Sequence, residues 1–242
     1  MAKGRTLVSL TIPCYNEGPF VFKAVKELDR VMAQSPWPYE IILFDDKSLD
    51  ETAKNIARIA EENPKIRAFF HEENQGRGQT VKDAIAMAKG SIVGFVDIDL
   101  EVAAHYVPAM VNAIEEGYDV AVADRIGKLG FRSLQRHFLS KMYQTMVRKL
   151  LNIGVNDTEA GCKFFNKERI MPILSKTKNK HWFWDTEIMA LAQYNGLRIK
   201  EISVVFSTNP ETESTVKIFS DSVDYLKQIW RFRNEMKKEG FI

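Results

Sequence analysis

The stretch Ser91-Ile92-Val93-Gly94-Phe95-Val96-Asp97-Ile98-Asp99, residues 91–99, sets the expected fold. A short apolar run that ends directly in two aspartates is typical of a buried strand with polar groups at its carboxyl end. Residues two apart in an extended chain project to the same side, so Asp97 and Asp99 can point in one direction. Such a pair can bind one divalent cation, although Asp-x-Asp alone is more often part of a turn. The surrounding chain decides between these interpretations.

Outward from this stretch, apolar runs alternate with helical patterns through the first half of the chain. Strands are expected at 7–12, 40–44, 66–70, 91–96 and 119–123, and helices at 20–32, 50–62, 106–116 and in the segment that ends at Ala88. This alternation predicts a single α/β domain with a mostly parallel sheet and helices on both faces. The second half is less regular, with helices expected at 134–151, 184–193 and 221–238 and strands at 163–165 and 197–206.

Composition narrows the function class. The chain has 242 residues, 45% of them apolar and 27% charged, and its net charge of +2 argues against a nucleic-acid partner. Cys14 and Cys162 have no disulfide or metal-ligand spacing, so reduced thiols in a cytosolic protein are expected. The start of the chain lacks a signal-peptide pattern, and no apolar run reaches about 18 residues. We therefore expect a cytoplasmic protein with at most peripheral membrane contact.

Polar residues cluster after the first, second and fourth expected strands. They are Tyr15, Glu17, Asp45, Asp46, Asp97 and Asp99. Because ligands of parallel sheets bind at the carboxyl ends of strands, these side chains are expected to share one site. Tyr15 could stack on a nucleobase while an aspartate accepts the imide N–H of uracil; an ordinary turn is the alternative.

Five segments, in this order, resemble the family-2 glycosyltransferases of the GT-A fold. They are IPCYNEG (12–18), FDDKSLDET (44–52), NQGRGQTVKDAI (74–85), FVDIDLE (95–101) and DTEAGCKFF (157–165). The subgroup they resemble is the dolichyl- or polyprenyl-phosphate hexose synthases. The resemblance implies a Rossmann-like GT-A domain over 1–242. Within it, 1–124 would bind the nucleotide-sugar, 125–219 would face the acceptor, and 220–242 would be an amphipathic helix.

The resemblance also implies the site residues. The nucleotide-sugar would be bound by Pro13, Tyr15, Glu17, Phe44, Asp46, Asp97 and Asp99. Mg²⁺ or Mn²⁺ would be held by Asp97, Asp99 and, where the subgroup commonly has glutamine, Glu101; Glu101 could instead face solvent. The catalytic residues would be Asp99 and Asp157, with Asp157 orienting the acceptor or acting as base. The acceptor phosphate would be contacted by Arg125, Arg136 and Lys163, and the donor phosphates by Arg77 and Lys82; solvated surface charge is the alternative for the arginines.

The implied reaction is an inverting, metal-dependent transfer of a hexose from a nucleotide-sugar to dolichyl or polyprenyl phosphate. The block Trp184-Asp185-Thr186-Glu187, together with DTEAGCK, resembles the UDP-glucose-using synthases more than the GDP-mannose-using ones, so UDP-glucose is the favoured donor and GDP-mannose the next. Alternatives are a polysaccharide or glycan acceptor, or an inactive nucleotide-sugar-binding subunit. Apolar and aromatic residues at 134–151, 182–184 and in the terminal helix fit either core packing or an interfacial surface. Peripheral contact with the cytoplasmic membrane face is what the resemblance implies for them. A nicotinamide dehydrogenase is disfavoured because the first strand lacks a Gly-x-Gly-x-x-Gly turn.

Overall fold

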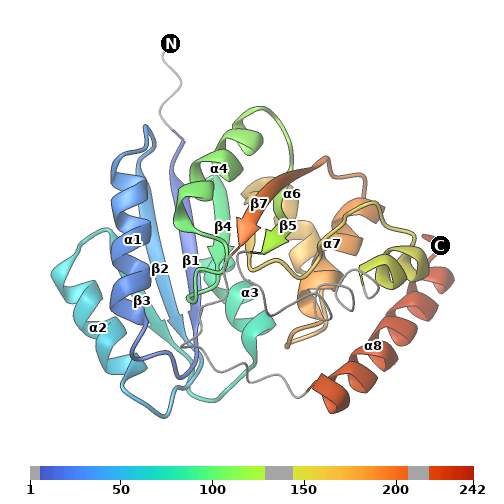
Figure 1. The fold of residues 1–242 in the computed structure, drawn as a ribbon, viewed down its shortest axis with the longest axis horizontal. Helices are drawn as coiled ribbons and strands as arrows, with labels where there is room; N and C mark the ends of the chain where they lie inside the picture. Colours follow the sequence, from blue (N-terminus) through green and yellow to red (C-terminus); the bar gives the residue numbers. More distant parts are fainter. Residues whose placement is uncertain (1–5, 129–143, 207–217) are drawn as a thin grey trace.

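The computed structural model describes residues 6–128, 144–206 and 218–242, which contain one seven-stranded sheet with helices on both faces (Figure 1). The strands are β1 (Val8–Cys14), β2 (Tyr39–Asp45), β3 (Ile66–Phe70), β4 (Ile92–Val96), β5 (Val120–Lys128), β6 (Cys162–Asn166) and β7 (Ile199–Phe206). Their order is β3-β2-β1-β4-β6-β5-β7, and β6 runs antiparallel to its neighbours β4 and β5 while the other pairs are parallel. The predicted mostly parallel α/β sheet is confirmed.

The helices match the expected positions closely in the first half. They are α1 (Val21–Ala33), α2 (Thr52–Glu62), α3 (Arg77–Met87), the short 3-10 helix η1 (Ala104–Tyr106), α4 (Val107–Glu115), α6 (Lys167–Leu174), α7 (Trp184–Tyr194) and α8 (Ile218–Lys238), with a further helix at residues 144–151. The remainder of the expected 134–151 helix lies outside the described residues. Helix α6 was not predicted from the sequence.

The first strand runs through Pro13 instead of ending there. Cys14 still pairs with Asp45, and its carbonyl accepts a hydrogen bond from the Asp46 N–H at 2.9 Å. Because backbone groups alternate in direction along a strand, Pro13 faces the β4 side, where pairing with β1 has already stopped at Thr11. The missing N–H of proline therefore costs no ladder bond here.

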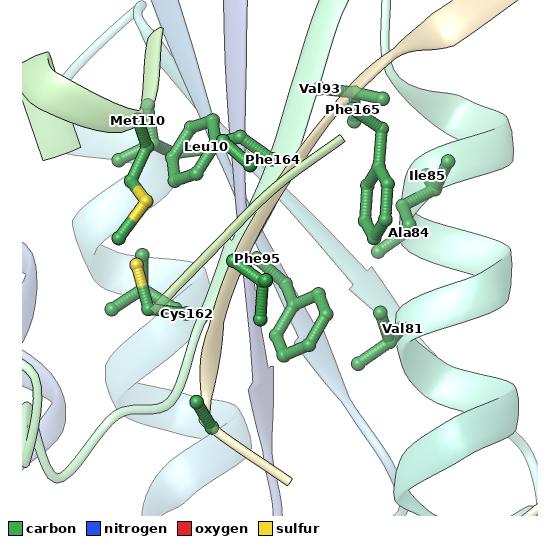
Figure 2. Close-up of a cluster of buried hydrophobic side chains, with 14 of the residues drawn as sticks. Leu10, Val81, Ala84, Ile85, Val93, Phe95, Met110, Cys162, Phe164 and Phe165 are labelled. Atoms are coloured by element: carbon green, nitrogen blue, oxygen red, sulfur yellow. The ribbon is translucent and has the colours of Figure 1, made fainter. Parts of the chain in front are cut away.

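The core lies on both faces of the strands β4 and β6 (Figure 2). Phe164 lies on the side of Leu10 and the α4 residue Met110, whereas Phe165 points toward Ala84 and Ile85 of α3. A Cβ added at Gly94 would meet the Phe164 ring at 2.4 Å, so the glycine allows the ring to lie directly across β4. This packing fixes β4, and with it the position of the two aspartates that follow.

The terminal helix α8 packs on the start of α7. The Phe183 ring contacts Tyr225 and Phe232, with ring centroids 5.3 and 5.7 Å apart. In the part of the chain that the structure describes, no helix is both long and apolar enough to cross a membrane. Phe183, Tyr225 and Phe232 thus pack against one another, and peripheral membrane contact of α8 stays a prediction.

Candidate active site

The loops after β1 and β2 are joined into one unit by hydrogen bonds. The N–H groups of Asn16, Glu17 and Gly18 donate to Ser48 Oγ (2.9 Å), Thr52 Oγ1 (2.8 Å) and Asp50 Oδ2 (3.0 Å) respectively. Asn16 adopts a left-handed backbone conformation (φ 56°), which asparagine tolerates better than most residues. The unit holds Tyr15, whose side chain is 45% exposed, at the carboxyl edge of the sheet.

Carboxylates from three strand ends converge at this edge. Burial, together with repulsion from the nearby Asp99, Asp50 and Asp97, raises the pKa of Glu17 to about 7. Burial likewise raises the pKa of Asp97, which Asp99 raises further while Arg77 opposes the shift. The pKa of Asp99 is also raised, mainly by burial. Neighbouring carboxylates repel one another, and a hard divalent cation, which prefers oxygen ligands, would relieve this repulsion. The residues present therefore fit Mg²⁺ or Mn²⁺.

Glu101 pairs with Arg125 in the structure. Its carboxylate lies 3.5 Å from Arg125 Nη1, and its N–H donates to Asp99 Oδ1 at 3.1 Å. Across the three described stretches, no group of three Asp, Glu, His or Cys side chains is arranged around one ion position. Two carboxylates such as Asp97 and Asp99 commonly suffice to bind Mg²⁺ together with substrate phosphates, and metal binding by Glu101 stays a prediction.

Arg77, at the start of α3, binds Asp97 and Asp185 at once. Its Nε and Nη2 donate to Asp97 Oδ1 at 3.1 and 2.5 Å, and its Nη1 bonds Asp185 Oδ2. Although burial opposes the charge, these carboxylates raise the pKa of Arg77 above its ordinary value. The guanidinium also stacks on Phe95 and Trp182, 5.2 Å from each ring centre. A fixed cation thus lies directly beside the candidate metal ligand.

Lys163 differs from its expected role. The side chain is fully buried, and Nζ donates to Asp185 Oδ1 at 2.6 Å and to the Ala160 carbonyl at 2.7 Å. An ammonium group enclosed in this way has no open side toward an acceptor phosphate. In this structure Lys163 joins β6 to α7, and its contact with an acceptor phosphate stays a prediction.

The turn before β6 presses against Asp97. The Asp97 N–H donates to the Gly161 carbonyl at 2.8 Å, and a Cβ added at Gly161 would lie 2.0 Å from Asp97 Oδ2. Only glycine can therefore occupy position 161 without moving the carboxylate. This contact links the β4 edge to the turn that carries Asp157.

Asp157 and Arg125 form the acceptor-side pair. Arg125 Nε and Nη2 donate to Asp157 Oδ2 and Oδ1 at 2.5 and 3.1 Å, and the Asp157 side chain is fully buried. Both carboxylate oxygens are thus engaged, which favours an orienting role over a base for Asp157. Arg136, the other expected phosphate contact, lies outside the described residues.

Phe44 and Asp46 are both buried. Phe44 is 5% exposed, and its ring packs against Phe69 and His71. Asp46 bonds His71 Nδ1 at 2.7 Å and accepts the N–H groups of Gln75 and Gly76, both at 2.8 Å. Both residues therefore shape the base of the expected nucleoside site.

The neighbouring Asp45 keeps one oxygen unused. Its Oδ2 accepts the Ser48 N–H at 3.1 Å, while the buried Oδ1 has no hydrogen-bond partner among the described residues. A buried carboxylate oxygen without a donor is unfavourable unless a ligand supplies one. Asp45 is thus a second candidate acceptor for a nucleobase N–H.

The sequence reasoning predicted no contact at the site for three contributors, which are Asp185, His71 and Gly161. Asp185 lies 108 positions from Arg77 and His71 lies 25 from Asp46, so no local periodicity could pair them. For Gly161 a signal existed, since a glycine directly before a strand can mark a close backbone approach.

Together, a carboxylate-lined edge of a mostly parallel sheet and a fixed arginine beside it form the candidate site of this fold. Residues 9–173 match the model of the family described as glycosyl transferase family 2, and the chain belongs to this family of enzymes. The resemblance stated from the motifs is thereby confirmed.

Curated relatives and solved structures agree with this assignment. The chain is 29% identical over 230 residues to glycosyltransferase AglD of Haloferax volcanii, covering 93% of this chain and 36% of that protein. It is 29% identical to a dolichyl-phosphate β-glucosyltransferase of Dictyostelium discoideum, covering 93% and 73%. Glucosyl-3-phosphoglycerate synthase of Mycobacterium tuberculosis, solved with Mn²⁺, UDP and phosphoglyceric acid, matches with a TM-score of 0.71 at 17% identity, covering 95% and 78%. That likeness shows a shared GT-A fold.

Proposed function

We propose that this chain transfers a hexose from a nucleoside-diphosphate sugar to dolichyl or polyprenyl phosphate, with inversion at the anomeric carbon. The observation that carries the proposal is the cluster of Asp97, Asp99 and Glu17 at the sheet edge, with Arg77 fixed beside it. Support for the acceptor comes from the dolichyl-phosphate β-glucosyltransferases among its relatives.

On the donor side, Tyr15 stacks on the base, Glu17 lies beside the nucleoside, and Asp46 or Asp45 accepts a base N–H, with Pro13 and Phe44 forming the floor. Asp97 and Asp99 hold Mg²⁺ or Mn²⁺, which when bound neutralises charge on the departing diphosphate. Arg77 adds a permanent positive charge at the same place. UDP-glucose is the favoured donor and GDP-mannose the next.

On the acceptor side, Asp157 holds Arg125 so that its guanidinium can bind the lipid phosphate, together with Arg136. A phosphate monoester is largely ionised at neutral pH, because its second pKa is about 6, so no strong base is needed. One phosphate oxygen attacks the anomeric carbon, the bond to the diphosphate breaks, and the single displacement inverts the centre. Positioning is then the main contribution of the protein.

Peripheral contact with the cytoplasmic membrane face belongs to the same proposal. Trp182 is 53% exposed and Trp230 is 51% exposed, and amphipathic aromatic side chains of this kind suit a lipid interface. The proposal also divides the chain into a donor half (1–124) and an acceptor half (125–219).

The experiment that tests the proposal offers the protein a panel of radiolabelled donors with polyprenyl phosphate and Mn²⁺. UDP-glucose, UDP-N-acetylglucosamine and GDP-mannose are compared, and the products are extracted into organic solvent. Label from UDP-glucose should enter the organic phase and disappear when Mn²⁺ is chelated. Label that is transferred only to water-soluble glycans would favour the alternative acceptor class, and no transfer to any acceptor would favour a binding subunit.

A further inference from the structure

Four charged side chains form a chain of ion pairs beneath the candidate donor site. Asp97 binds Arg77, Arg77 binds Asp185, and Asp185 binds Lys163, which in turn donates to the Ala160 carbonyl. The members come from the end of β4, the start of α3, the first turn of α7 and β6. Asp185, whose two oxygens bind different cations, is the link between them.

The ion pairs of Asp185 are largely buried. Its side chain is 3% exposed, that of Arg77 13% and that of Lys163 0%. Buried ion pairs are often no more stable than well-packed apolar residues of similar size, because each charge loses its hydration. Stability alone therefore explains poorly why two cations and two carboxylates are gathered at the edge of a binding site.

The geometry of Arg77 supplies a functional reason. Of the five guanidinium hydrogens, the bonds to Asp97 and Asp185 use three, and two others remain for further acceptors. Because Asp185 also binds the guanidinium, Arg77 can keep its orientation when Asp97 binds a metal ion. Without Asp185, Arg77 would be fixed only by Asp97, the residue that the metal would recruit.

We propose that Asp185 is a positioning residue for the donor site: it fixes Arg77 beside Asp97 and, through Lys163, ties this edge to the turn that carries Asp157. Asp185 does not touch the diphosphate itself but acts through Arg77. The inference rests on the proposed function only in assigning a nucleoside diphosphate to the carboxylate edge.

Binding of UDP and Mn²⁺, measured by titration calorimetry without any acceptor, tests the role of Asp185. Asp185→Asn should weaken UDP–Mn²⁺ binding about tenfold, and Arg77→Gln should weaken it by a similar factor. The double variant should be no weaker than either single variant, since both remove one interaction. Glu187→Gln is the matched control. Glu187 is also a buried carboxylate of α7, but it accepts the N–H groups of Lys178 and Asn179, so its variant should bind UDP–Mn²⁺ normally even if it melts earlier.

The outcomes separate cleanly. Normal binding by a folded Asp185→Asn protein, or additive losses in the double variant, would overturn the inference. If Asp185→Asn does not fold, Arg77→Gln is the deciding variant, because it leaves the Lys163–Asp185 pair in place. Normal UDP–Mn²⁺ binding by Arg77→Gln would also overturn the inference. Failure of the wild-type chain to bind UDP or GDP with Mn²⁺ would instead remove the proposed donor site, and this inference with it.

Discussion

Asp97 and Asp99 are two residues apart, yet they have different partners. Asp97 is bonded by Arg77 and pressed by the Gly161 turn, whereas the carboxylate of Asp99 is bonded by the Glu101 N–H at 3.1 Å. Substitution of Asp97 therefore disturbs the ion-pair network as well as the metal site. Asp99 is the position at which catalysis can be separated from folding.

Asp99→Asn should lower kcat/KM by about 100- to 1000-fold, the usual effect of removing one electrostatic contact to a transition state. The melting temperature should stay the same or rise slightly, because burial penalises the charge that is removed. Sugar transfer and circular dichroism on the same preparation measure both quantities. Glu62→Gln, which alters an exposed pair with Arg58, serves as control. Retention of full turnover by Asp99→Asn would exclude this residue from catalysis.

Glu40 illustrates a buried carboxylate that serves stability. Burial alone would raise the pKa of Glu40, but hydrogen bonds from Ser9 Oγ (2.7 Å), the Lys89 N–H (2.6 Å) and Arg67 (2.9 Å) leave it below the ordinary value. A depressed carboxyl pKa contributes stability that is present above the unfolded pKa of about 4.3 and is lost as pH falls through the folded pKa.

Glu40→Gln should therefore reduce the free energy of unfolding by about 1–2 kcal/mol near pH 7. The difference from wild type should stay constant down to about pH 5 and shrink below about pH 4, as the wild-type carboxylate takes up its proton. Urea unfolding across this range measures it. Glu27→Gln, in an exposed pair with Arg30, should change little at any pH. A difference that persisted unchanged at pH 3 would contradict the assignment.

At the scale of elements, the turn before β6 decides how close the donor and acceptor sides can come. Gly161→Ala forces a Cβ to within 2.0 Å of Asp97 Oδ2, so either the turn or the carboxylate must move. Overpacking of this kind costs about 1–3 kcal/mol. We expect lower stability together with UDP–Mn²⁺ affinity reduced at least about tenfold.

Gly154→Ala is the matched control for this substitution, because among the described residues the added Cβ would meet only Gln193 Oε1 at 3.6 Å, an ordinary contact. Thermal unfolding and calorimetric titration should show a clear loss for position 161 and little change for position 154. Equal behaviour of the two variants would mean that the turn does not constrain Asp97.

Elements with strong periodicity were predictable, and short ones fixed by their neighbours were not. Strand β3 was predicted to the residue, because its five residues form a mostly apolar run between turn segments. Helix α6 was missed, since its eight residues contain Pro172, which normally interrupts a helix. Its start is set by the Asn166 side chain, which accepts the Arg169 N–H at 3.3 Å, and it packs between β6 and α7.

At the scale of the molecule, the sequence placed the carboxylates on one edge because parallel strands share a polarity. The sequence did not show which cationic side chain binds which carboxylate. The contacts of Lys163 with Asp185 and of Glu101 with Arg125 were not predicted, because the partners come from other elements of the fold. Such pairs arise from packing, which no local pattern records.

The molecule as a whole should report the joint binding of metal and nucleotide through its thermal stability. A ligand that binds only the folded state adds about 2.7 kcal/mol at a concentration 100 times its Kd, which for a chain of this size is a rise in melting temperature of about 5–10 °C. Because Asp97, Asp99 and Glu17 repel one another, Mn²⁺ with UDP should produce this rise, whereas UDP with a chelator should produce little. The same addition should leave Asp99→Asn nearly unchanged. A full rise with UDP in the presence of chelator would show that Arg77 and its neighbours hold the diphosphate without a metal, and would contradict the two-carboxylate metal site.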